Sequence, residues 1–242
     1  MRFKLICCDV FMRMACLAIA NTPHIIDPEF TELGAHENSA KLRDILQKKI
    51  DEADKTGIYD AILLGYGLCG NSTAGLKAGN TPLVIPRAHD CCTIFLGSKE
   101  KFLEYFKENL SAQWSSIGYM ERSSDYLRNT DTGKLLGLDK DYEELVEKYG
   151  EENAKYIWET LHPEYSNDEF IYIYIPDFEN LGYREKAKSV AEKENKTFRL
   201  LKGDMRIIID LINGNWNEND FLIVPAGNEI KAIYDNDRII SI

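Results

Sequence analysis

Cysteine and histidine are the residue types in this sequence that could carry chemistry. The cysteines stand early in the chain: Cys7, Cys8, Cys16, Cys69, Cys91 and Cys92. All but Cys16 fall at predicted strand ends or in the loops just after them, and His89 stands two residues before Cys91. Zinc and ferrous iron both accept thiolate and imidazole ligands. Our first hypothesis is therefore a metal set of Cys8, Cys69, His89 and Cys91.

Three apolar runs must position these side chains. Phe3–Cys8, Tyr59–Leu64 and Leu83–Ile85 are predicted strands, and a cysteine or a cysteine-bearing loop ends each of them. Ligands of parallel sheets bind beyond the carboxyl ends of the strands, and neighbouring strands lie about 4.8 Å apart. We therefore expect the loops to bring their thiols together at one sheet edge.

Two pairs of adjacent cysteines leave the ligand choice open. Successive side chains of a strand point to opposite faces, so at most one of Cys7 and Cys8 faces the site, and we favour Cys8. The sequence does not decide between Cys91 and Cys92 in the same way. Cys16 fits a buried structural role, because a free cysteine usually packs as a small hydrophobe.

The loop after the second strand reads Gly65-Tyr66-Gly67-Leu68-Cys69-Gly70-Asn71. Its glycine spacing superficially matches a dinucleotide-binding fingerprint. The acidic residue expected about 20 residues further on is missing, apart from Asp90 in the cysteine loop. We therefore interpret Gly67 as a position where the backbone approaches a ligand or metal closely, with Asn71 as a neighbouring donor.

Three further side chains are candidates for substrate binding. Arg87 stands at a strand end, where it would bind a carboxylate or phosphate, or form a structural ion pair. Asp90 lies between His89 and Cys91 in the same loop. His36 precedes a predicted helix, where it would either reach the cleft or cap the helix.

The order of elements predicts the fold class. Apolar strands alternate with amphipathic helices, which is typical of an α/β fold with mainly parallel sheets. We expect two Rossmann-like βα lobes, comprising residues 1–110 with the Cys/His loops and residues 166–242. Residues 111–165 are expected to form a helical connector.

Composition excludes several classes of protein. The 242 residues include 29 Lys and Arg against 40 Asp and Glu, for a net charge of −11. This balance, without a basic cluster, argues against binding to nucleic acid or to an anionic membrane. No apolar run approaches the roughly 18 residues of a membrane span, and the N-terminus does not resemble a secretory signal. A chain this long with six cysteines and no signal is not a disulfide framework, so we expect a cytoplasmic protein.

The two cysteine loops carry a family resemblance. The blocks Gly65–Asn71 and Ile85–Cys91, followed by Leu96-Gly97-Ser98, resemble domain-of-unknown-function family sixteen-thirty-eight. The resemblance extends over most of the chain, including Cys8 and the region of His36. It implies a setting in anaerobic archaea and bacteria, often beside genes for corrinoid-dependent methyl transfer. The doubled cysteines of this sequence depart from the family pattern and leave its ligand assignment open.

These observations lead to three functional hypotheses. The first is a zinc or iron protein of anaerobic one-carbon metabolism that would assist thiol or corrinoid methyl transfer, since His89-x-Cys91 resembles part of the zinc site of such methyltransferases. Those enzymes place the remaining cysteine downstream, whereas here it lies upstream. The second is a non-catalytic corrinoid or metal accessory protein, with a methyltransferase or corrinoid protein as its partner. The third is an iron–sulfur protein that uses three cysteines.

Overall fold

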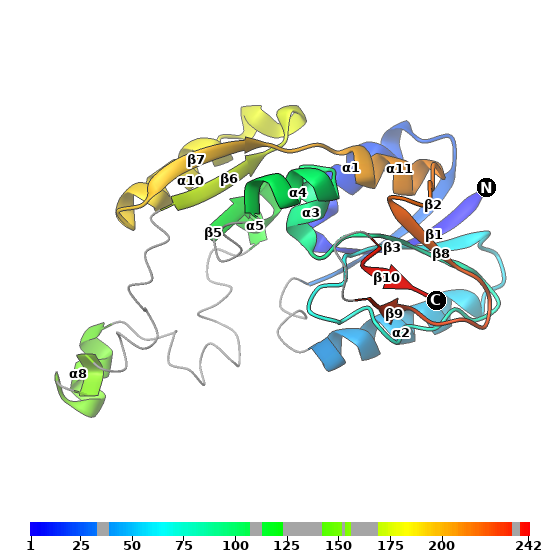
Figure 1. Cartoon of the computed structure of the whole chain (residues 1–242), viewed down its shortest axis with the longest axis horizontal. Coiled ribbons are helices and arrows are strands. Elements are labelled where there is room, and N and C mark those ends of the chain that lie inside the picture. The colour runs from blue at the N-terminus through cyan, green and yellow to red at the C-terminus, as the bar shows by residue number, and fades with distance from the viewer. Residues whose placement is uncertain (33–38, 107–112, 123–141, 152, 156–168, 234–237) are drawn as a thin grey trace.

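The computed structural model describes residues 1–32, 39–106, 113–122, 142–151, 153–155, 169–233 and 238–242. The main sheet has five strands in the order β2-β1-β3-β4-β8 (Figure 1). The first four strands in that order are parallel, and β8 is antiparallel to β4. Its strands are β1 (Arg2–Cys8), β2 (Ile25–Thr31), β3 (Ala61–Gly65), β4 (Leu83–Pro86) and β8 (Phe221–Val224).

Helices cover both faces of this sheet. Every residue of β3 and β4 is buried, as expected for strands with layers on both sides. On one face α2 (Ser39–Asp54) buries an apolar stripe of Leu42, Leu46, Ile50 and Ala53. On the other face α1 (Met12–Asn21) packs beside α11 (Arg206–Asn213), as Figure 1 shows. α1 connects β1 to β2, whereas α2 leads from β2 back past β1 to β3. Crossovers of one hand that run in opposite directions place their helices on opposite faces.

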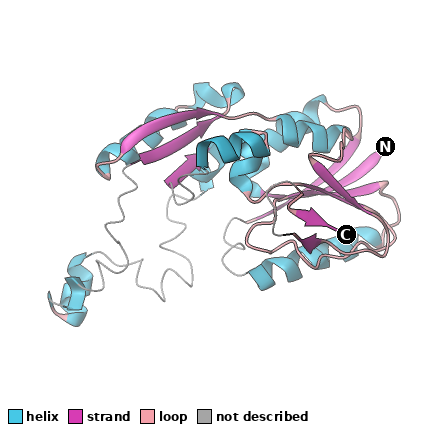
Figure 2. Cartoon of the chain, in the orientation of Figure 1, coloured by secondary structure: helices cyan, strands magenta, loops and turns pink. Residues whose placement is uncertain are grey.

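A second, parallel sheet has the order β5-β6-β7. Its strands are β5 (Gln113–Ser116), β6 (Glu169–Tyr174) and β7 (Thr197–Lys202), and α10 (Tyr183–Lys193) packs on it. A short hairpin of β9 (Lys231–Ala232) and β10 (Ile240–Ser241) follows β8. The remaining described elements are the 3-10 helices η1 (Asp9–Phe11) and η3 (Pro176–Leu181) and the helices α3 (Cys91–Leu96), α4 (Lys99–Phe106), α5 (Ile117–Arg122) and α8 (Tyr142–Tyr149) (Figure 2).

The α/β prediction is confirmed, and the helices and mostly parallel sheets are Rossmann-like. The strands do not divide between the sheets at the expected lobe boundaries. β5 lies within the expected helical connector but pairs with β6, and β8 lies within the expected C-terminal lobe but pairs with β4. One hydrophobic core contains side chains from both sheets. Ile171 of β6 and Leu201 of β7 belong to the same cluster as the buried residues of β1 and β3. Among the described residues, no helix is both long and apolar enough to span a bilayer.

Candidate functional site

The candidate site forms at the carboxyl edge of the main sheet. Cys7 is opposite Gly65 in the β1–β3 register, so Cys8 lies at the point where both strands end. The loop after β3 carries Cys69, and the loop after β4 leads into α3, which begins at Cys91. We call Cys8, Cys69 and Cys91 the thiol cluster.

The two cysteine loops prolong the pairing of β3 with β4. Main-chain N–H groups of Leu68 and Cys69 donate to the carbonyls of Ala88 and His89, at 2.8 and 2.9 Å. A Cβ at Gly67 would lie 2.8 Å from the carbonyl oxygen of Ala88 and 2.9 Å from the nitrogen of Asp90. Glycine is therefore needed for the loops to meet, and the close approach predicted at this position is made to the neighbouring loop.

Cys91 occupies the centre of the thiol cluster. Its thiol is hydrogen bonded to those of Cys69 and Cys8. The bond with Cys69 favours the thiolate and lowers the pKa of Cys91, but the bond with Cys8, burial and the charges of Cys8 and Asp90 outweigh it. The pKa of Cys91 is therefore raised well above its ordinary value, and this thiol is neutral in the metal-free protein.

Two tyrosines that sequence reasoning missed enclose the cluster. The Tyr119 hydroxyl, on α5, is hydrogen bonded to Cys91, and burial followed by the nearby thiols raises the pKa of this phenol. Tyr66 is fully buried and hydrogen bonds through its hydroxyl to Thr31, at the end of β2. Burial, then the charge of Cys8, raises its pKa as well. Tyr66 stood inside the glycine-rich loop, whereas no sequence signal marked Tyr119.

His89 and the cysteines outside the predicted ligand set lie elsewhere. Cys7 Sγ points at Gly65, where an added Cβ would lie 2.3 Å away, and Cys16 is exposed on α1, contrary to the buried role expected for it. The His89 ring lies beside Phe102, with 6.1 Å between ring centroids. The structure thus groups three of the four predicted metal ligands, and the imidazole faces a different neighbour.

The predicted substrate-binding residues have mainly structural contacts. Arg87 donates to the carbonyls of Glu218, Phe221, Arg238 and Ile240. Asp90 caps α3 by accepting from Thr93 N at 3.1 Å, and burial raises its pKa. Asn71 is exposed in a left-handed conformation, with φ of 67°. His36 lies outside the described residues.

The donor set suits a soft metal, although the thiols are not arranged around one. Within the part of the chain that the structure describes, no group of three or more His, Cys, Asp or Glu side chains is placed so that it could hold a metal ion. The thiols of the cluster are instead joined through their protons. A metal ion would replace those protons, because thiolate is the form that ligates.

The comparisons with known proteins identify a family. A family model described as "Protein of unknown function (DUF1638)" matches residues 30–212. The chain belongs to this family. The segment matched to DUF1638 contains Cys69, Cys91 and Tyr119 and begins after Cys8. The comparison with curated proteins and the comparison with solved structures give no match.

Buried thiols predict a loss of stability at high pH in this DUF1638 protein. Burial is the largest cause that raises the pKa of Cys7 and of Cys92, and the pKa of Cys91 is also raised. Their contribution to stability is complete below the unfolded pKa of about 8.5 and is lost as the pH rises from there towards the folded pKa. Between these two pKa values, each thiol lowers the free energy of unfolding by about 1.4 kcal/mol per pH unit.

Urea unfolding at pH 7.5 and 9.5, with reductant and chelator present, measures this loss. The free energy of unfolding should fall by several kcal/mol, and Cys92→Ala should reduce the difference by about 1.4 kcal/mol. Cys16→Ser is the control, because Cys16 is exposed. Equal free energies at the two pH values would contradict the prediction.

Proposed function

We propose that the chain binds a soft metal ion, zinc or ferrous iron, through the thiolates of Cys8, Cys69 and Cys91. The observation that carries the proposal is the direct contact of the Cys91 thiol with both other thiols. Residues so far apart in sequence meet here because their loops leave adjacent strands at the same sheet edge. Three cysteines in contact exceed what a structural core needs, since a single cysteine packs as well as any small apolar residue.

The surroundings of the cluster support metal binding. Tyr119 supplies a hydrogen bond to the Cys91 sulfur, and outer hydrogen bonds of this kind orient metal ligands and tune them. Phe95 and Trp114 pack around Tyr119, with centroid separations of 6.3 and 5.0 Å. Cys69 is half-buried, so a small molecule could approach the cluster from its side.

The number of protein ligands to the proposed metal indicates whether the site is structural or catalytic. Catalytic zinc sites keep an open position beside three protein ligands. We propose that this position holds a substrate thiol as its nucleophilic thiolate, in methyl transfer. The iron–sulfur alternative is favoured by the place of His89 beside Phe102, because the cluster is then all sulfur and iron–sulfur clusters bind through cysteine.

Elemental analysis of anaerobically purified protein tests the proposal. We expect about one zinc or iron ion per chain, and Cys69→Ser should weaken binding by more than about 100-fold, since loss of an outer hydrogen bond alone costs roughly 10- to 100-fold. Cys16→Ser is the matched control and should keep the metal. Wild-type protein that reaches less than about a fifth of an ion per chain, even after reconstitution, would remove the proposal.

Spectroscopy on the same preparations separates the alternatives. An iron–sulfur cluster is brown, whereas a zinc site is colourless. In the cobalt(II)-substituted protein, a small alkyl thiol that takes the open position should increase the thiolate-to-cobalt absorbance by about a third, as sulfur ligands rise from three to four. An unchanged spectrum would exclude the substrate-thiol role while leaving metal binding intact.

A further inference from the structure

The thiols of the cluster meet in pairs. The Cys91 thiol is hydrogen bonded to that of Cys69 and to that of Cys8, so the Cys91 sulfur contacts both of the others. A disulfide needs only two sulfurs in contact, whereas a metal needs all of its donors around one point. The contacts that the structure shows are therefore already those of a dithiol pair.

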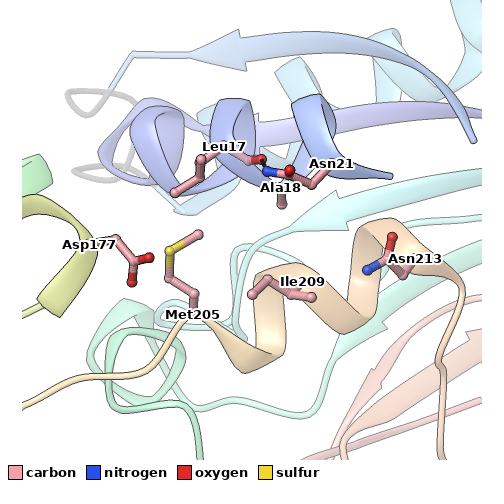
Figure 3. Close-up of a pocket in the computed structure, with 7 residues that line it drawn as sticks. All are labelled: Leu17, Ala18, Asn21, Asp177, Met205, Ile209 and Asn213. Atoms are coloured by element: carbon pink, nitrogen blue, oxygen red, sulfur yellow. Dashed lines mark hydrogen bonds between the residues drawn. The ribbon is translucent and has the colours of Figure 1, made fainter. Parts of the chain in front are cut away.

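The thiols differ in their access to solvent. Cys8 is fully buried and Cys91 is 3% exposed, whereas Cys69 is half-buried. The cavity of about 310 Å³ between α1 and α11 does not lead to them, because none of its lining residues is a cysteine (Figure 3). The oxidation of a cysteine depends on its exposure, so a small oxidant should meet Cys69 first.

The position of Cys69 in a loop favours closure onto Cys91. The Cys69 amide donates to the His89 carbonyl at 2.9 Å, which holds its loop beside the one that leads to Cys91. The turn after Cys69 has room, because the nearest atom to a Cβ added at Gly70 is Ser39 Oγ at 3.6 Å. Cys8, by contrast, belongs to β1, which lies between β2 and β3 in the sheet.

We propose that Cys69 and Cys91 form a reversible disulfide when the protein meets a peroxide, and that this bond prevents metal binding. The disulfide is carried by the contact of the two sulfurs and by the access of solvent to Cys69. Its effect on the metal rests on the proposed function, whereas the disulfide itself does not.

The reaction proceeds in two steps. The Cys69 sulfur first attacks one oxygen of the peroxide, the O–O bond breaks, and the other oxygen leaves as water with the thiol proton. The sulfur is oxidised to a sulfenic acid. The Cys91 sulfur then displaces the hydroxyl group from Cys69, which leaves as water with the proton of Cys91, and the S–S bond forms.

The neighbours of Cys91 assist the second step. Its sulfur is already in contact with that of Cys69, so the step is intramolecular and needs little reorientation. The Tyr119 hydroxyl is hydrogen bonded to the Cys91 sulfur, where it stabilises the negative charge that develops as the proton leaves. The product would remove two of the three proposed metal ligands, because the sulfur of a disulfide is no longer a thiolate.

Peptide mass spectrometry of the full, metal-free chain tests the disulfide. The Cys16→Ser variant serves as the parent, because it lacks the exposed thiol. After treatment with a small molar excess of hydrogen peroxide and alkylation of the remaining thiols, we expect one bond, between Cys69 and Cys91, that dithiothreitol reverses. Cys92→Ala in this parent should form the same bond, which distinguishes Cys91 from its neighbour. A bond between any other pair, or oxidation without a bond, would overturn the proposal.

Two further variants of the same parent test the order of the steps. Cys91→Ser should stop at the sulfenic acid of Cys69, which dimedone traps. Cys69→Ser should leave Cys91 as a thiol, because the oxidant then lacks its point of entry. Oxidation of Cys91 in Cys69→Ser at the rate seen in the parent would show that Cys69 does not react first and would overturn the assignment.

The zinc-loaded protein separates this proposal from the proposed function. Peroxide should release about one zinc ion per disulfide formed, measured with a chromogenic chelator. A chain that forms the disulfide but binds no zinc would remove the proposed function alone. A chain that binds zinc but forms no disulfide, with or without the metal, would remove this proposal alone. A disulfide that forms while the zinc stays bound would contradict the loss of metal binding.

Discussion

Gly67→Ala is expected to lower the melting temperature by about 8 °C and to abolish the proposed metal binding. The added Cβ would lie within 3 Å of main-chain atoms of Ala88 and Asp90. Neither is the end of a flexible side chain, so the loops themselves must separate. We estimate a cost of about 3 kcal/mol from overpacking, which corresponds to roughly 6–12 °C for a chain of this size.

The separation would act on the site directly. It would lengthen the main-chain bonds from Leu68 to Ala88 and from Cys69 to His89, which hold the loops together. Cys69 would then leave Cys91, and the proposed metal set would lose its third ligand. Calorimetry and elemental analysis of the same purified variant measure the two effects.

Gly57→Ala is the matched control for this prediction. Gly57 has φ of +62° and no atom within 4 Å of an added Cβ, so alanine there costs only about 1 kcal/mol of backbone strain. Its metal content should stay at the wild-type level. If Gly67→Ala melts like Gly57→Ala and still binds metal, the loops are not held as the structure shows.

Arg87→Ala is expected to lower the free energy of unfolding by about 3–4 kcal/mol. The Arg87 guanidinium connects the end of β4 to the segment before β8 and to the segment before β10. It donates to the carbonyls of Glu218 and Arg238, each at 2.9 Å. Hydrogen bonds from a charged donor contribute roughly 1.5–3 kcal/mol each and are not additive. Arg87→Lys should recover less than half, because a single ammonium group cannot span these acceptors.

Urea unfolding and limited proteolysis check this prediction. The C-terminal hairpin should become the first site of cleavage in Arg87→Ala, while the metal content is unchanged. Arg184→Ala is the control: Arg184 forms an exposed ion pair with Glu179 at 2.9 Å, which contributes less than about 1 kcal/mol. Full stability combined with weakened ligand binding would instead restore the role of substrate anchor expected from the sequence.

Local pattern was sufficient to find most strands and helices. The strand predicted at Leu83–Ile85 is observed at Leu83–Pro86, because a short apolar run that ends at a proline has few alternatives. Trp114–Tyr119 falls within the expected helical connector, and the structure divides it between β5 and α5. A strand of four residues followed at once by a short helix gives neither the strand periodicity nor the helix periodicity enough residues to dominate.

Sheet membership depended on tertiary contacts. β8 resembles any other short apolar strand, yet it pairs antiparallel with β4 because α11 packs against the main sheet beside α1 and brings the chain back. We expected each lobe to consist of consecutive segments of the chain. A strand instead pairs with whichever sheet has an edge strand that is not yet paired on its outer side. The sequence indicates where the strands are, but not which edge strand remains available for pairing.

The sequence by itself determined that cysteines of separate strand ends would share one edge of a parallel sheet, because strand direction alone sets where those ends lie. It did not determine which side chains face one another. Folding turned Cys8 towards Cys91 and His89 towards Phe102. It also brought Tyr119 to the thiols, on a helix whose Gly118 lies against Val10 so closely that a Cβ would be 1.8 Å from its carbonyl oxygen. Side-chain direction at a loop is decided by the loop's main-chain bonds and by packing from distant segments, and neither is written in local sequence pattern.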